Sequence, residues 1–82
     1  MHDLVILKAL ADRTRLSIVR TLLKGEMCAC ELPKLVGRAQ PTVSLQLKKL
    51  VRAGILACRK DGTKMLYRVV NPKVAVILRN LN

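Results

Sequence analysis

The stretch from Gln40 to Gly54, with the sequence QPTVSLQLKKLVRAG, decides the fold. Proline is tolerated in the first turn of a helix, where its missing N–H would have no partner, and glycine commonly ends a helix. Pro41 and Gly54 therefore bound a predicted helix from Gln40 to Ala53. Apolar residues at helical spacing supply its buried stripe, at Val43, Leu47, Leu50 and Val51.

The rest of this helix surface is polar and basic. Gln, Thr and Ser near a helix N-terminus can reach base edges in the major groove of DNA, and lysines further along suit phosphates. The alternative is that Thr42 and Ser44 merely solvate the helix. The residues expected to contact DNA are Gln40, Thr42, Ser44, Leu45, Lys48 and Lys49.

Three shorter helices are predicted before this one. Leucines at helical spacing predict a helix over Asp3–Ala11, and Asp12 can cap a second helix over Arg13–Leu23. A third should lie within Met27–Val36, separated by a turn at 37–39 from the helix Gln40–Ala53, called the reading helix below because its side chains are expected to contact the bases. A helix, a turn and a second helix that enters the major groove form a helix-turn-helix.

A β-hairpin and a last helix are predicted after Gly54. Residues 55–60 and 63–70 are typical of two strands around the favoured two-residue turn Asp61-Gly62, and Asn71-Pro72 opens a helix. The hairpin would present further cations to a DNA backbone, namely Arg59, Lys60 and Lys64. The expected fold is mainly α with a small β-hairpin, a winged helix-turn-helix in one domain over 1–82, in the order α-α-α-α-β-β-α.

The charge balance indicates a polyanionic partner. The 82 residues include 16 Lys and Arg against five acids, a formal charge of +11. A membrane surface is the weaker choice, because no basic amphipathic helix carries Trp or Phe and no apolar run could span a bilayer.

No paired carboxylate, Ser/His/Asp set or phosphate-binding loop indicates an enzyme. Three cysteines and no signal-peptide pattern are typical of the reducing cytoplasm.

Several segments, in order, resemble the ArsR-type repressors that respond to metals and thiols. Residues 7–16 (LKALADRTRL) are similar to the family's opening, 40–47 (QPTVSLQL) to its reading helix, and 52–56 (RAGIL) with 67–69 (YRV) to its exit into the wing. In this sequence Arg13 replaces a common Pro, and Ala39 stands where a capping Ser is usual.

The resemblance implies a homodimer that places two reading helices on a double-stranded DNA operator of twofold symmetry. Its first and last helices would form the interface, and both carry an apolar face that a three-helix core could not fully cover. The residues expected there are Leu4, Leu7, Val74, Ile77, Leu78 and Leu81.

Cys28-Ala29-Cys30 resembles the Cys-x-Cys of the arsenic- and soft-metal-responsive members. Residues two apart point about 200° from each other in a helix, but to the same side in an extended segment. Pro33 places the start of the third helix at or after Cys30, its expected cap, so both thiolates can share an ion. Soft thiolates favour As(III), Sb(III), Cd(II), Pb(II) or Zn(II). The family's third cysteine corresponds to Pro33, and Cys58 is expected to be remote.

The predicted function is a sequence-specific, homodimeric repressor that a soft metal or metalloid at Cys28 and Cys30 releases from its operator. No obligatory cofactor is expected. Two alternatives remain open: a repressor of the same fold that responds to thiol oxidation, and a non-specific basic chromosomal protein. Cys28 and Cys30 could also be purely structural.

Overall fold

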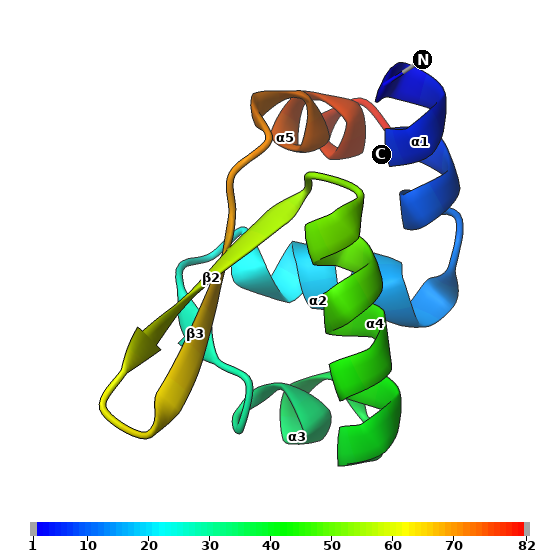
Figure 1. Cartoon of the computed structure of the whole chain (residues 1–82). Helices are drawn as coiled ribbons and strands as arrows, with labels where there is room; N and C mark the ends of the chain where they lie inside the picture. Colours follow the sequence, from blue (N-terminus) through cyan, green and yellow to red (C-terminus); the bar gives the residue numbers. More distant parts are fainter. Residues whose placement is uncertain (1, 82) are drawn as a thin grey trace.

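The computed structural model describes residues 2–81, which fold in the order α-α-β-α-α-β-β-α (Figure 1). The predicted helices and hairpin are present, and one further strand precedes the third helix. The elements are α1 (His2–Leu10), α2 (Arg13–Leu22), β1 (Met27–Cys28), α3 (Leu32–Val36), α4 (Gln40–Arg52), β2 (Leu56–Asp61), β3 (Lys64–Val69) and α5 (Pro72–Arg79). No helix in this described part is long and apolar enough to cross a membrane.

An aliphatic core joins all five helices to β2. Ile18 and Val19 of α2 are fully buried in this core, and the partly buried Tyr67 packs against it. The remaining buried members are Ile6, Leu10, Leu22, Leu32, Val43, Leu47, Leu50, Ile55, Leu56, Val74 and Leu78. Because α5 inserts two of these side chains, the last helix is part of the core as well as a surface element.

Local chemistry sets the ends of the helices. The Asp12 carboxylate accepts a hydrogen bond of 2.9 Å from the Arg15 backbone N–H, as expected of an N-cap. Asn71 caps α5 in the same way through the Lys73 N–H, also at 2.9 Å. Gly54 follows α4 with φ +76°, a left-handed conformation that favours glycine.

The sheet has three antiparallel strands in the order β1-β3-β2, so the expected hairpin was correct but incomplete. In β1, Met27 lies opposite Tyr67 and Cys28 opposite Leu66. The Ala29 N–H extends this pairing with a 2.9 Å hydrogen bond to the carbonyl of Met65. The loop that carries the cysteine pair is therefore hydrogen-bonded directly to the hairpin.

The start of α3 differs by one residue from the expectation. The helix begins at Leu32 with Glu31 as its N-cap residue, and no side chain caps it, so the prediction of Cys30 as cap was wrong. Pro33 occupies the second helical position, where its missing N–H costs nothing. Both cysteines thus precede the helix.

Candidate nucleic-acid interface

The helix α4 divides its surface between the core and solvent, but one residue predicted for its buried stripe was wrong: Val51 is 36% exposed. Val43, Leu47 and Leu50 are at most 1% exposed. The six side chains expected to contact DNA are all exposed: Gln40, Thr42, Ser44, Leu45, Lys48 and Lys49. In Figure 1 the N-terminal end of α4 and the tip of the β2–β3 hairpin project toward the same side, away from α1 and α5.

A tight turn connects α3 to α4. Gly37 adopts φ +69°, and the carbonyl of Pro33 accepts hydrogen bonds from the N–H groups of Gly37 and Arg38 at 2.9 and 3.1 Å. Ala39 then precedes α4 in an extended conformation and gives no side-chain cap. The turn brings α4 back across α2 and leaves its polar side outermost.

Arg15 links α4 to the first two helices. Its Nε donates to the carbonyl of Ala9 in α1 at 2.7 Å, and its Nη1 donates to Oε1 of Gln46 in α4 at 2.8 Å. Both bonds are partly buried, so water competes with them less than at an open surface. Sequence reasoning missed this contact, because its partners lie 31 residues apart and no spacing pattern connects them.

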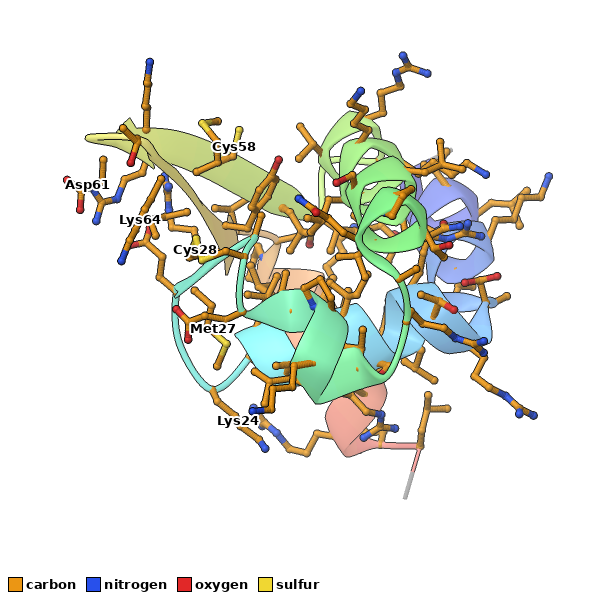
Figure 2. The ribbon with its side chains drawn as sticks, turned by 90° about the horizontal axis from the view of Figure 1, so that it is seen from below. Lys24, Met27, Cys28, Cys58, Asp61 and Lys64 are labelled. Atoms are coloured by element: carbon orange, nitrogen blue, oxygen red, sulfur yellow. A yellow bond between two sulfur atoms is a disulfide. The ribbon has the colours of Figure 1, made fainter. Side chains whose placement is uncertain are left out.

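The β2–β3 hairpin, called the wing below, carries the three expected cations, and all are exposed. Lys60 and Lys64 lie near the tip on either side of the turn, where Lys64 pairs with Asp61 in the strand register. Figure 2, which views the molecule from below, shows Asp61 and Lys64 at the far end of the hairpin. Cations at this position can contact a DNA backbone beside the groove that α4 would enter.

The third wing cation already has an anionic partner. Arg59 donates to both carboxylate oxygens of Glu26, with Nη2–Oε1 at 2.8 Å and Nε–Oε2 at 3.0 Å, and Arg68 lies 3.9 Å from the same carboxylate. The hydrogen bond from Arg59 lowers the pKa of Glu26, and the same contact raises the pKa of Arg59. No local sequence pattern predicts this pairing across 33 residues.

The reading helix and its approach are free of acidic residues. From Leu32 to Lys60 the chain has no Asp or Glu, but seven Lys and Arg. Of the acids elsewhere, Asp12 caps α2, Glu26 holds the wing arginines, and Asp3 contacts Lys73 at 2.9 Å. The charge excess is thus concentrated where a polyanion would contact α4.

Cys28 and Cys30 lie together at the edge of the sheet. Cys28 belongs to β1 and is 4% exposed, whereas Cys30 follows in an exposed loop. Their Cα atoms are 5.1 Å apart and the structure joins them by a disulfide. The Cys30 N–H also donates to Sγ of Cys28 at 3.2 Å. The extended segment brings both sulfur atoms to one place, and two thiolates could bind an ion jointly after reduction.

In the part of the chain that the structure describes, Cys28 and Cys30 are the two candidate metal ligands at the edge of the sheet. Among residues 2–81, no group of three or more His, Cys, Asp or Glu is arranged to hold a metal ion. Cys58 is a free, exposed thiol on β2, opposite Tyr67, whose other neighbour is Met27. Since directly paired residues share a face of a sheet, Cys58 lies on the opposite face from Cys28. Figure 2 shows the two cysteines on different strands.

The residues expected at a dimer interface divide into two groups. Val74 and Leu78 are at most 3% exposed within the chain's own core, so a second copy cannot contact them as predicted; α5 turns them inward. Leu4, Leu7 and Leu81 are at least 50% exposed, and Ile77 is partly buried. Val5 and Val76, both about half exposed, extend this apolar surface of α1 and α5.

Comparison with known proteins agrees with the arrangement of α4, wing and core. Residues 12–57 match the model of the bacterial regulatory protein, arsR family. The chain belongs to the ArsR family. It is 42% identical over 77 residues to the arsenical resistance operon repressor of Staphylococcus aureus, covering 94% of this chain and 74% of that protein. It is a transcriptional repressor of this family and has the winged helix-turn-helix fold of a DNA-binding protein.

Solved structures of transcriptional regulators superimpose closely on this chain. The transcriptional repressor BigR from Xylella fastidiosa has a TM-score of 0.89 at 36% identity, with 94% of this chain and 79% of that chain covered. The homodimeric winged helix-turn-helix domain of Mb0332 from Mycobacterium bovis has a TM-score of 0.87 at 29% identity, with 98% and 74% covered. The sequence-based assignment to this family and fold is confirmed.

Proposed function

We propose that this ArsR-family chain is a homodimer that binds one operator sequence and is released when a soft metal or metalloid ion binds Cys28 and Cys30. The observation that carries the DNA-binding part is the exposed, acid-free outer face of α4 beside a cationic wing. Thr42 and Ser44 offer hydrogen bonds to base edges, and Lys48 and Lys49 lie further along α4, where phosphates would pass.

The exposed apolar surface on α1 and α5 supports the proposed dimer. Chains of this size bury little surface alone, and covering Leu7 and Val76 against a second copy would add to the apolar burial. In Figure 1 the same surface lies at the opposite end of the molecule from the N-terminal end of α4. A twofold axis through it would leave both reading helices free to engage adjacent half-sites.

The proposed inducer site is the cysteine pair, and its position supports control of DNA binding. Cys30 lies two residues before α3, while Cys28 is paired through β1 with the wing strand β3. An ion held by both thiolates would thus act on the helix-turn-helix and on the wing together. The similarity to an arsenical resistance repressor favours As(III) or another soft ion. A third ligand would come from solvent or a small thiol.

Thiol oxidation is the second candidate, because the structure holds Cys28 and Cys30 as a disulfide. In that reaction the two thiols give up two electrons and two protons to a peroxide, a persulfide or a small-molecule disulfide, and the S–S bond forms. Both candidates place the protein in a reducing cytoplasm, where the pair is kept as thiols between signals.

One titration separates the two candidates. Reduced protein on its operator is treated with As(III), Cd(II), Zn(II) or a persulfide donor, and fluorescence anisotropy follows release. We expect As(III) or Cd(II) to weaken binding roughly 5- to 150-fold, a typical allosteric coupling. Cys28→Ser and Cys30→Ser should keep DNA binding and lose this response, whereas Cys58→Ser, the matched control, should keep both.

The outcomes are distinct. Release by the persulfide donor alone would favour the redox repressor, and release of the Cys28→Ser/Cys30→Ser double variant by As(III) or Cd(II) would exclude the site. A third measurement addresses the chromosomal alternative. Binding to operator and to random DNA is compared across a salt series, and equal affinities throughout would contradict sequence-specific binding.

A further inference from the structure

Leu45 is an apolar side chain on the polar side of the reading helix. It is 53% exposed, whereas Val43 and Leu47, two residues before and after it, are 1% exposed. Two residues in a helix correspond to a rotation of about 200°, so Leu45 points almost directly away from the buried stripe. Single exposed leucines are common on protein surfaces, and the position of this one distinguishes it.

The residues that surround Leu45 on the helix surface are ones expected to contact DNA. Residues three and four apart are adjacent on a helix surface, so Leu45 lies between Thr42 on one side and Lys48 and Lys49 on the other. All three neighbours are exposed. Lys48 and Lys49 are cations suited to contact the DNA backbone, and Leu45 lies one turn before them on the same exposed side of α4.

Gln46 is less available for the same task. It lies partly buried beside Leu45, and its carbonyl oxygen is held by the Arg15 guanidinium at 2.8 Å. The amide oxygen of the polar side chain that follows Leu45 is thus already engaged in a hydrogen bond within the protein. At the middle of the outer face, the group presented to DNA is therefore apolar.

We propose that Leu45 is a specificity-determining residue that recognises the C5-methyl group of a thymine in the major groove. Leucine has no hydrogen-bond donor or acceptor, and the thymine methyl is the apolar group that unmodified DNA presents there. This inference rests on the proposed function as a sequence-specific DNA-binding protein. It adds the chemistry of one operator position: a thymine in each half-site, recognised by apolar contact.

The test begins with an operator obtained by selection from random DNA with the unmodified chain. Each thymine of that operator is then replaced by deoxyuridine, which lacks the methyl group and keeps every hydrogen-bonding group. We expect one thymine per half-site at which the replacement weakens binding about fourfold, the effect of losing one buried methyl-sized group. At the remaining thymines the affinity should stay within twofold.

Variants assign the effect to Leu45. Leu45→Ala should bind the thymine operator several-fold more weakly and lose the sensitivity to deoxyuridine at that one position. Leu45→Met, which keeps an apolar side chain of similar length, should retain the sensitivity. Leu35→Ala is the matched control, because Leu35 is 56% exposed on α3, outside the reading helix, and its removal should leave the sensitivity intact.

Each contrary result has a separate meaning. If selection recovers no sequence, the proposed function itself fails, before Leu45 is tested. If an operator is found but deoxyuridine has no effect at any position, the methyl contact is absent. Leu45→Ala with undiminished deoxyuridine sensitivity, or with equal losses on operator and random DNA, would also overturn the proposal. Circular dichroism of each variant checks that the exposed substitutions leave the fold unchanged.

Discussion

At the residue scale, two helix starts differ in one side chain. Asp12 and Ala39 both adopt extended conformations before a helix, with ψ 130° and 151°. The Asp12 carboxylate accepts the Arg15 N–H, whereas the Ala39 methyl group can accept nothing. Because Pro41 has no N–H, the Thr42 N–H is the one that a cap at position 39 would satisfy.

The first prediction concerns these caps. Ala39→Ser should raise the free energy of unfolding by about 1 kcal/mol, and Asp12→Ala should lower it by a similar amount. Urea denaturation at neutral pH measures both. A loss of stability in Ala39→Ser would contradict the extended geometry at residue 39.

The pH dependence of the free energy of unfolding tests the prediction for Asp12. The hydrogen bond from Arg15 lowers the pKa of Asp12 below its ordinary value of 3.8. The folded chain thus binds this proton more weakly than the unfolded chain, so the stabilisation is complete above that value and declines as the pH falls through the lowered pKa. The difference between the chain and Asp12→Ala should shrink there, in denaturation curves at successive pH values.

At the element scale, Arg15 joins three helices, and a double-mutant cycle can measure the link. Its bonds to Ala9 and Gln46 hold α4 against α1 and α2. Hydrogen bonds to charged groups contribute about 1.5–3 kcal/mol, so Arg15→Ala should destabilise the chain by roughly that amount. Gln46→Ala should cost less, and the double variant should cost less than the sum. Strict additivity would show that the two side chains do not interact.

The wing offers a second prediction at this scale. A DNA phosphate would compete with Glu26 for Arg59, since both are anions that accept a bidentate guanidinium. Glu26→Gln removes the competing charge. We expect tighter binding to any DNA, by about two- to fivefold, and a steeper dependence of affinity on salt, by nearly one phosphate contact. Asp61→Asn, which removes a charge of the same sign at the wing tip, is the matched control.

The direction of the change decides the role of Glu26. Weaker binding of Glu26→Gln at every salt concentration would mean that the carboxylate orients Arg59 for DNA instead of competing for it. Low pH should imitate the substitution. The contact lowers the pKa of Glu26, so the carboxylate stays charged at neutral pH and is neutralised only as the pH falls below its ordinary value of 4.5.

The elements also show what the sequence could predict. Helix α4, the caps at Asp12 and Asn71 and the turn at Asp61-Gly62 depend on neighbouring residues, and local patterns sufficed for them. The strand β1 has two residues and exists because β3, about 40 positions later, pairs with it. The contacts of Arg15 with Gln46 and of Glu26 with Arg59 join residues that lie 31 and 33 positions apart in the sequence. No periodicity marks such pairings before the chain is folded.

Burial of α5 was mispredicted for a related reason. Val74 and Leu78 form an apolar stripe, and a stripe alone does not say which surface covers it. In the folded chain α5 packs this stripe on the core and leaves Val76 outside. The sequence therefore predicted that the last helix is amphipathic, but not which of its residues remain for a partner.

At the scale of the whole molecule, the two ends have different surfaces. The end with the tip of α4 and the wing is cationic, and the opposite end, formed by α1 and α5, exposes aliphatic side chains (Figure 1). Arg15, on α2, donates hydrogen bonds to both α1 and α4 and so connects the two ends. Dimerisation at one end would thus set the spacing of reading helices at the other through a hydrogen-bonded connection.

The last prediction separates dimerisation from folding. Val76 is 52% exposed on α5, so Val76→Glu should leave the monomer folded while placing a charge in the proposed interface. We expect a monomer in sedimentation equilibrium and an operator affinity lower by about 100-fold or more, because two linked half-site contacts become independent. Leu35→Glu, equally exposed at the opposite end, is the control and should remain dimeric. If Val76→Glu sediments as a dimer, α5 lies outside the interface and the half-site geometry must arise from another surface.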